Sequence, residues 1–360
     1  MRRSLVAAAA ASALLLTAPL PALATPAAGP ATPRTSLVSS QVLMPFNLAH
    51  AAGQLYVADG ATRQVSRVVG QRLATVATGQ ADGDVAGLDV SANGRFVAFT
   101  TTNASHSKTT LEIYGPQGRR VSADLSAYER RVNPDRRVSY GIDDPSQCVR
   151  DAFAKVPDAG PATYRGLVDS HPYAVARLGR DWVVADAGGN DLLRVSPSGR
   201  VSTVAVLPRQ PLRITAAMAK SMGLADCVVG KVYHFESVPT DVEVGRGGWL
   251  YVTTLAGGPE DPSFGARSKV YRVNPRTGRT TQIGSGFAGA TNLALKGDKV
   301  YVAEFYAGRI SVLRHGRPKP YVTLKNALSL EAAPRGLYAG TSADFGPTGP
   351  VGSGSIVHIR

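Results

Sequence analysis

The chain has 360 residues, of which 44% are hydrophobic and 18% charged, and its 40 Lys and Arg against 26 Asp and Glu give a net charge of +14. No stretch is long and apolar enough to predict a membrane span in the mature chain, since a spanning helix needs about 20 apolar residues. The basic residues are scattered without a run interleaved with aromatic residues, so no specific nucleic-acid partner is predicted. An ordinary solvated surface and a surface for an anionic envelope polymer both remain open.

A signal peptide is predicted over residues 1–24. A positively charged start, Arg2 and Arg3, precedes an apolar run of signal-peptide length and an Ala-Leu-Ala cleavage pattern. We expect export by the Sec route, cleavage before Thr25, and a protein that is secreted or associated with the cell wall. An uncleaved anchor is the alternative. Residues 25–35 are rich in Ala, Pro and Thr and predict a flexible lead.

Over residues 36–360 one strand-turn-strand phrase recurs six times. Each copy has a polar residue and an apolar pair, and then an apolar run of the Leu-Tyr-Val-Ala type that commonly closes on an acid or Thr. The six apolar runs are 55–58, 96–99, 182–185, 250–253, 300–303 and 337–339. One four-stranded sheet cannot bury both of its faces, but sheets stacked radially cover one another. The repeat therefore predicts an all-β, six-bladed β-propeller in one domain, with a monomer as the expected state.

The ends of this region predict how the ring closes. A third, alternating strand follows most of the apolar runs, and the sixth unit stops after its third strand at residue 359. Residues 36–43 form a strand-like segment before the first unit and have no partner there. We expect this segment to supply the outer strand of the sixth blade.

Two inserted segments, about 126–170 and 210–236, interrupt the repeat. Residues 215–222 predict a short helix. Cys148 and Cys227 are the two cysteines of the chain, and one lies in each insertion. In an exported protein this predicts a disulfide that ties the insertions together, with two separate buried thiols as the alternative.

The repeat also brings two sets of polar side chains to one mouth of the central channel. The first set lies eight or nine residues before each apolar run, and the second lies where each run ends. With His171 and the turn residue Asn190, the candidate binding residues are Asn47, Asp59, His171, Asp186, Asn190, Asp241, Asn292 and Glu304. Carboxylate and amide oxygens suit Ca²⁺ or Mg²⁺, so the candidate ligands of an axial cation are Asp59, Asp186, Asp241, Asn292 and Glu304. The alternative is that these acids cap tight turns.

No motif in the sequence names a reaction. The histidines have no metal-ligand spacing, and there is no nucleophile elbow, P-loop or haem motif. Two hypotheses remain: a non-catalytic binding or scaffold protein of the envelope or exterior, and a cation-dependent hydrolase or lactonase acting at the axial carboxylates. The first predicts that Asn can replace Asp59, Asp186, Asp241 or Glu304 with little loss of stability, and its partner would be an anionic envelope polymer or another exported protein.

Two phrases carry a resemblance to a family. They are residues 186–195, Asp-Ala-Gly-Gly-Asn-Asp-Leu-Leu-Arg-Val, preceded by His171-Pro172-Tyr173, and residues 238–242, Val-Pro-Thr-Asp-Val, followed by 257–259 and 269–273. The chain resembles the ScyD/ScyE family of exported β-propellers, related to NHL and TolB-like propellers, over nearly its whole mature length. The resemblance implies fold and export but no reaction or catalytic residue. The cysteine-bearing insertions depart from the short loops of that family.

Overall fold

The structure is a computed structural model that describes residues 33–156, 159–258, 264–347 and 349–360. The expected signal peptide and most of the expected lead lie outside the described residues. None of the helices in the described part of the chain is long and apolar enough to span a membrane.

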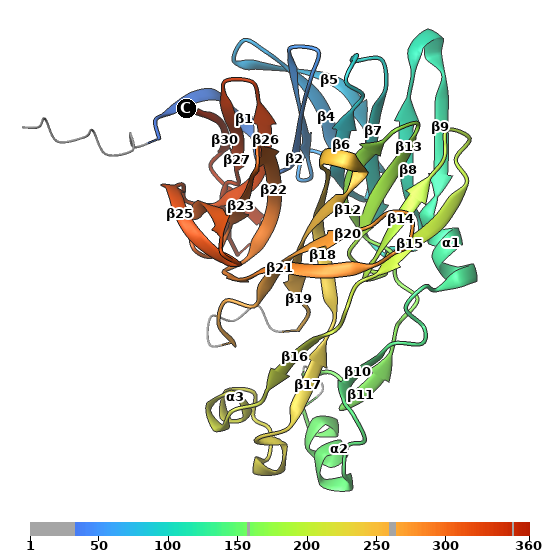
Figure 1. Cartoon of the computed structure of the whole chain (residues 1–360), viewed down its shortest axis with the longest axis vertical. Coiled ribbons are helices and arrows are strands. Elements are labelled where there is room, and N and C mark those ends of the chain that lie inside the picture. The colour runs from blue at the N-terminus through green and yellow to red at the C-terminus, as the bar shows by residue number, and fades with distance from the viewer. Residues whose placement is uncertain (1–32, 157–158, 259–263, 348) are drawn as a thin grey trace, which may run out of the picture. The chain divides into compact units, whose positions relative to one another are not determined.

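Six four-stranded antiparallel sheets form the blades of a propeller (Figure 1). Blades 1 to 3 run in chain order from the innermost to the outermost strand. Blade 1 is β2 (Pro45–Ala51), β3 (Gln54–Asp59), β4 (Gln64–Val69) and β5 (Arg72–Thr78); blade 2 is β6 (Gly83–Val90), β7 (Val97–Asn103), β8 (Thr109–Tyr114) and β9 (Arg120–Asp124); blade 3 is β12 (Pro172–Leu178), β13 (Asp181–Asp186), β14 (Asp191–Val195) and β15 (Val201–Val206).

The remaining three blades repeat this order, and the last is completed by a strand from the N-terminal side. Blade 4 is β18 (Ser237–Val244), β19 (Leu250–Ala256), β20 (Ser268–Val273) and β21 (Thr280–Phe287); blade 5 is β22 (Ala290–Lys296), β23 (Lys299–Glu304), β24 (Arg309–Arg314) and β25 (Arg317–Thr323); blade 6 is β26 (Ala327–Ala333), β27 (Gly336–Thr341), β30 (Gly354–Ile359) and β1 (Thr35–Val42). The predicted six-bladed propeller is confirmed.

Strand β1 closes the ring, as the sequence predicts. It pairs antiparallel with β30 from Thr35 opposite Ile359 to Val42 opposite Gly354. Val42 is fully buried, and the backbones of Arg34 and Arg360 exchange two hydrogen bonds of 2.9 Å beyond the strand. The first and last parts of the fold are therefore held in one sheet, which leaves no free edge on β30.

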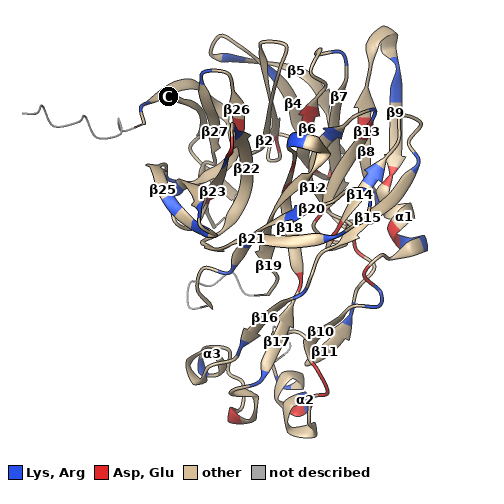
Figure 2. Ribbon diagram, viewed as in Figure 1, with Lys and Arg blue, Asp and Glu red and all other residues tan. Residues whose placement is uncertain are grey.

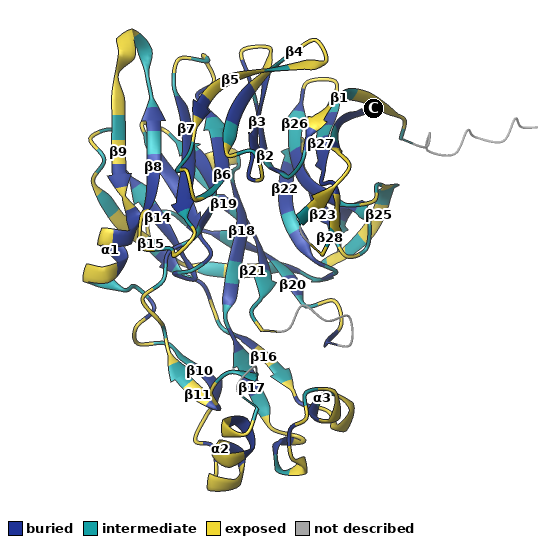
Figure 3. Cartoon of the chain, turned by 180° about the vertical axis from the view of Figure 1, so that it is seen from behind, coloured by how far each residue is buried: buried dark blue, intermediate teal, exposed yellow. Residues whose placement is uncertain are grey.

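The apolar core lies between neighbouring blades, where Figure 3 shows the inner strands coloured as buried. One cluster packs Val183 and Leu192 of blade 3 against Val242, Leu250 and Tyr271 of blade 4. Equivalent clusters join other neighbouring blades. This explains the almost continuous apolar runs in the sequence, because both faces of each second strand are covered.

The two insertions build a lobe with its own sheet. It has the order β11 (Thr163–Arg165), β10 (Ser139–Ile142), β17 (Val232–Phe235) and β16 (Gln210–Arg213), so that β10 and β17 join the two insertions. In Figure 1 this sheet lies beyond the blades, beside the helices α2 (Gln147–Ala154) and α3 (Ala216–Ser221). The helix α1 (Leu125–Val132) leads from blade 2 into the lobe. We refer to residues 133–170 and 208–236 as the inserted lobe.

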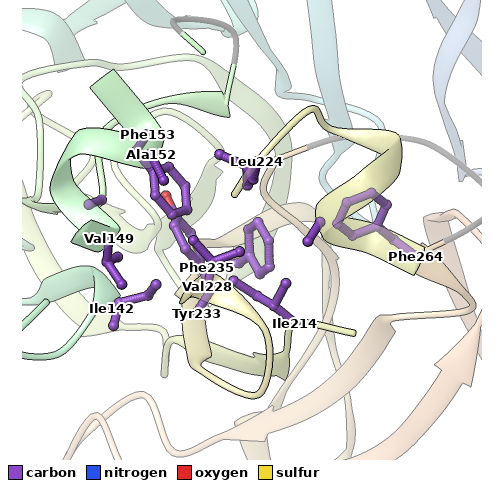
Figure 4. Packing of buried hydrophobic residues seen from close by; sticks show 12 residues of the cluster. Ile142, Val149, Ala152, Phe153, Ile214, Leu224, Val228, Tyr233, Phe235 and Phe264 are labelled. Carbon is purple, nitrogen blue, oxygen red and sulfur yellow. The ribbon is translucent and has the colours of Figure 1, made fainter. Parts of the chain in front are cut away.

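A separate apolar core and a disulfide hold the inserted lobe together. Phe153 from α2, Tyr233 and Phe235 from β17 and Leu224 meet in one buried cluster (Figure 4). Cys148 and Cys227 form the predicted disulfide, with 6.4 Å between their Cα atoms. The helix predicted at 215–222 is confirmed as α3, whereas the sheet and the helices α1 and α2 were not predicted from the sequence.

Candidate functional site

A register shift at the start of each innermost strand shapes the channel mouth. In five blades the pairing of the first two strands skips one residue, which is the arrangement of a β-bulge. The skipped residues are Phe46, Tyr173, Thr240, Thr291 and Leu328. A bulge turns one side chain out of the normal alternation and is common beside functional sites. In blade 2 the shift falls on Ala86, which has only a methyl group, and on Gly87, which has no side chain, and neither residue lines the pocket.

All five skipped residues line one pocket of about 570 Å³ at this mouth. The pocket walls are completed by loops of blades 1, 3, 4, 5 and 6, and they include Met44, His171, Leu255, Phe305, Tyr306 and Phe345. Tyr306 and Phe345 are about half exposed. Phe46 and Tyr173 meet edge to face at 5.6 Å between ring centroids, and Phe305 has the same relation to Phe345 at 6.4 Å. A pocket of this size with a mostly apolar wall is typical of a small-molecule site.

Two histidine–aspartate pairs lie beside the pocket, and His171 and Asp169 of these pairs belong to its wall. His171 Nε2 is 2.9 Å from Asp84 Oδ2, and His106 Nδ1 is 3.0 Å from Asp169 Oδ1. The two imidazole rings lie 4.2 Å apart, and the ring of Tyr173 lies 4.7 Å from that of His171. The carboxylates orient both rings, so this side of the pocket offers fixed hydrogen-bonding groups beside an aromatic surface.

The acids at the ends of the second strands hold the loops that lead into their own blades. Asp59 accepts hydrogen bonds from the backbone N–H groups of Leu43 and Met44 at 2.7 and 3.2 Å, and of Thr62 at 3.2 Å. Asp186 accepts from the hydroxyl of Ser170 at 2.6 Å and from the N–H of His171 at 2.7 Å. Both acids are almost fully buried. Desolvation raises the pKa of Asp186, and these hydrogen bonds oppose that rise.

Glu304 has the same place in blade 5. It accepts from the N–H of Ala288 at 2.8 Å, and its other partners are Arg309 and the hydroxyl of Ser311. The oxygens of these three acids are therefore occupied by backbone and side-chain donors. Because each acid fixes a loop at the channel mouth, we now expect its replacement by Asn to lower stability, unlike the tolerance expected from the sequence.

The polar residues of the first strands link blades instead of lining the pocket. Asp241 Oδ2 accepts from the N–H of Leu293, and Asn292 Oδ1 accepts from the N–H of Leu330, each at 2.8 Å. Asn47 hydrogen-bonds the Asp241 carboxylate from another blade. Burial raises the pKa of Asp241 to about 7, opposed by these hydrogen bonds. Asp241 and Asn292 are thus buried between blades and are not part of the pocket wall.

Three further acids of the innermost strands were not singled out in the sequence. Asp89, Glu243 and Glu331 lie near Asp241 in the channel, and burial raises the pKa of Asp89 to about 6. Burial and mutual repulsion raise the pKa values of Glu243 and Glu331 well above their ordinary range. In the described residues no group of three His, Cys, Asp or Glu side chains is arranged to hold a metal ion.

Of the eight candidate residues, the structure places only His171 in the wall of the pocket. Asn190 lies elsewhere, with its side-chain amide donating to Asp135 at 3.1 Å. Each skipped residue comes directly before the position on its first strand that the repeat pattern predicted to face the channel mouth. Strict alternation along the first strand predicts that the next residue faces the pocket. The register shift shows that the skipped residue does so instead. The aromatic residues Phe46 and Tyr173 were the features of the sequence that could have indicated this pocket.

A second cavity, of about 560 Å³, lies in the inserted lobe. It is lined mainly by apolar side chains, among them Phe153, Tyr164, Met218, Met222, Leu224 and Phe235. Lys and Arg do not gather beside either cavity, and Figure 2 shows them spread over many elements of the described chain.

Comparisons with known proteins establish the fold. No protein-family model matches the chain, and no curated protein matches it in sequence. Similar solved structures include an oxidoreductase (glucose dehydrogenase) described as putative from Thermus thermophilus, with TM-score 0.55, 16% identity and coverage of 91% of this chain and 100% of that chain. The PQQ-bound aldose sugar dehydrogenase of Streptomyces coelicolor has TM-score 0.52, 12% identity and coverage of 92% and 100%. A Bacteroides thetaiotaomicron protein of unknown function has TM-score 0.51, 11% identity and coverage of 91% and 76%. At these identities the likeness shows a shared β-propeller fold and carries no activity to this chain.

Proposed function

We propose that this chain is an exported β-propeller protein that binds a small molecule, without converting it, in the pocket at the channel mouth. The ligand would have an aromatic or apolar body and a polar end. The observation that carries the proposal is that five register shifts, one in each of five blades, turn their side chains into the same pocket.

The distribution of groups around the pocket supports this ligand class. Phe46, Tyr173 and Phe305 offer ring surfaces against which an aromatic molecule can stack. The hydroxyl oxygen of Thr291 is buried without a hydrogen-bond partner, and His171, which Asp84 holds at 2.9 Å, also lines the pocket. An aromatic body would occupy the ring-lined part, and its polar end would meet Thr291 or His171.

The cation-dependent hydrolase that the sequence left open has weaker support. Asp59, Asp186 and Glu304 use their oxygens to accept hydrogen bonds from loops and neighbouring side chains, which leaves few for a metal ion. Asp241 and Asn292 bond to neighbouring blades in the same way.

We also propose export and a relation to the ScyD/ScyE proteins. The N-terminal signal pattern and the disulfide support export, and the phrases at 171–173 and 186–195 support the relation to that family. Expression in a bacterial host with fractionation and N-terminal sequencing tests export. A released protein that begins at Thr25 supports it, and a full-length protein retained in the cytoplasm contradicts it.

A fluorescence titration with 8-anilinonaphthalene-1-sulfonate, followed by a panel of aromatic compounds, tests binding. We expect saturable binding that Tyr173→Ala or Phe46→Ala weakens about tenfold, which corresponds to about 1.4 kcal/mol. Met218→Ala, in the cavity of the inserted lobe, is the matched control and should leave this binding unchanged. Binding that only Met218→Ala weakens would place the ligand in the lobe and contradict the proposal.

Mass spectrometry of each bound compound after incubation separates binding from catalysis. Recovery of the unchanged compound supports a binding protein. Conversion that is abolished by EDTA, or by Asp241→Asn, would support the hydrolase instead.

A further inference from the structure

A second group of polar side chains lies where α1 meets blade 3, and none of its four residues lines the pocket. Glu129 is on α1, and Asp135 follows that helix at the base of the inserted lobe. Asn190 lies in the turn between β13 and β14, and Asp191 is the first residue of β14. Asp135 Oδ2 accepts a hydrogen bond from the Asn190 side chain at 3.1 Å, which joins the base of the lobe to blade 3. It also accepts from the hydroxyl of Tyr140 at 3.0 Å.

Six side-chain oxygens in this group are buried and have no hydrogen-bond partner. They are both carboxylate oxygens of Glu129, both of Asp191, Oδ1 of Asp135 and Oδ1 of Asn190. All four residues have an exposed fraction of 2% or less. Most buried polar atoms in folded proteins are hydrogen-bonded, so six unpartnered oxygens in one place indicate a missing partner.

One unpartnered carboxylate oxygen of Glu129 and one of Asp191 face a common space beside Gly189. Glu129 Oε2 and Asp191 Oδ2 each lie 3.5 Å from the point where a side chain at position 189 would begin. The two oxygens are therefore within about 7 Å of each other. Because residue 189 is a glycine, no side chain fills the space between them.

No positive side chain balances these acids in the described residues. The ion pairs of Lys and Arg involve other acids, and Arg130 and Arg131 on the same helix are directed to the carbonyl of Ser107 and to the ring of Tyr128. Burial raises the pKa of Glu129 to about 8, and burial with repulsion from Asp186 and Glu129 raises that of Asp191 well above its usual range. Unpaired buried carboxylates are costly, so a compensating proton or cation is required.

We propose that Glu129, Asp135, Asn190 and Asp191 bind a divalent cation, with Ca²⁺ preferred. All six free atoms are oxygens, and Ca²⁺ takes six to eight oxygen ligands in flexible geometry, whereas Mg²⁺ requires a near-ideal octahedron. The carboxylates do not yet surround one point, so binding includes a turn of Glu129 and Asp191 toward the space beside Gly189.

The bound ion would join the base of the inserted lobe to blade 3. Glu129 and Asp135 come from the segment that leads into the lobe, and Asn190 and Asp191 come from the blade. Asp186, at the end of β13, pairs in register with Asp191 and holds the backbone of His171. The site is therefore distinct from the channel mouth but shares one turn with it.

Thermal unfolding of the full exported chain after EDTA treatment, with Ca²⁺ or Mg²⁺ added back at millimolar concentration, tests the proposal. A ligand that binds only the folded state raises the midpoint by mass action, so we expect a rise of several degrees with Ca²⁺ and a smaller one with Mg²⁺. Tb³⁺ serves as a second probe, because Tyr140 lies beside Asp135 and can sensitise its emission. Ca²⁺ should displace Tb³⁺.

Matched variants locate the ion. Asp191→Asn and Glu129→Gln should each abolish most of the Ca²⁺ shift and the Tb³⁺ signal. Asp298→Asn, at an exposed acid, and Asp241→Asn, in the channel, should keep both. The proposal fails if Ca²⁺ produces no shift, if the shift survives in both site variants, or if Asp241→Asn alone removes it. Where Asp191→Asn does not fold, Glu129→Gln decides between these outcomes.

Discussion

At the scale of single residues, the same side-chain type has different roles according to its place in the blade. An acid at the end of a second strand accepts hydrogen bonds from the loop before the first strand, as Asp59 and Asp186 do. An acid on a first strand faces the channel or a neighbouring blade, as Asp89 and Asp241 do. These positions are predicted to respond differently to substitution.

Replacement of Asp59 by Ala should destabilise the protein strongly. The change leaves the N–H groups of Leu43, Met44 and Thr62 without their acceptor, and we expect a loss of about 2–4 kcal/mol in the free energy of unfolding. Urea denaturation of the variant and of Asp298→Ala, an exposed control, measures this loss. Equal stability of the two variants would show that the Asp59 hydrogen bonds contribute little.

Replacement of Asp89 by Asn should change how stability depends on pH. The pKa of Asp89 is raised to about 6 in the folded protein, mainly by burial, while Arg177 and two backbone N–H groups lower it and Asp241 and Glu331 lie close by. The folded state therefore keeps this proton after the unfolded chain has lost it. The contribution of Asp89 to stability is full below about pH 4 and is lost as pH rises through about 6.

The Asp89→Asn variant should lack this pH-dependent contribution to stability. Unfolding midpoints measured from pH 4 to pH 7 should fall more steeply for the unmodified protein than for Asp89→Asn. The variant also loses one acceptor of a backbone N–H, from Arg177 or Val90, which lowers its stability by a constant amount but not its slope. Parallel curves over this range would contradict the raised pKa.

At the scale of elements, the register between the first two strands of a blade determines which side chain lines the pocket. The shifts at the starts of β2, β12, β18, β22 and β26 direct five side chains into one pocket, although each strand keeps its alternation elsewhere. Strand β1 has a different task, since it supplies the fourth strand of blade 6 from the other end of the described chain.

Removal of β1 should open the ring. A chain that begins at residue 44 lacks the strand Thr35–Val42, which exposes the edge of β30 and the core around the buried residue Val42. We expect a large fall in the thermal midpoint and aggregation through the free edge. A chain that begins at residue 33 is the matched control. Similar midpoints and solubility for the two chains would show that blade 6 is stable with three strands.

At the scale of the whole described unit, the ring and the inserted lobe bury their apolar residues separately. The ring buries its apolar residues between blades, whereas the inserted lobe has a cluster of its own around Phe153 and Tyr233 and is closed by the disulfide. Regions with separate cores can open separately.

Removal of the disulfide should therefore loosen the lobe before the ring. Cys148→Ser with Cys227→Ser releases a cross-link over 79 residues, and the chain-entropy account gives about 4 kcal/mol for such a loop. Limited trypsin digestion with mapping of the cuts should show cleavage within residues 133–170 and 208–236 while the blades stay intact. Cuts spread equally over the blades would indicate that lobe and ring unfold together.

The blades, their number, the closing strand and the disulfide could all be predicted from the amino-acid sequence. Each of these depends on local patterns, such as apolar runs between turns, or on counts, such as two cysteines in a chain with a predicted signal peptide. The ring was predictable because the same local phrase recurs six times, and a repeated sheet has few ways to cover its faces.

The pocket, the lobe sheet and the cluster around Glu129 could not be predicted from the sequence. The pocket depends on one-residue register shifts, which move Phe46 and Tyr173 into the wall in place of their neighbours Asn47 and Ala174. The lobe sheet pairs strands of only four residues from segments about ninety residues apart, so no local sequence pattern predicts this sheet. Glu129 and Asp191 meet for the same reason, because their proximity results from the packing of a helix against a distant turn. Local composition fixes which strands form, and long-range packing fixes which side chains meet.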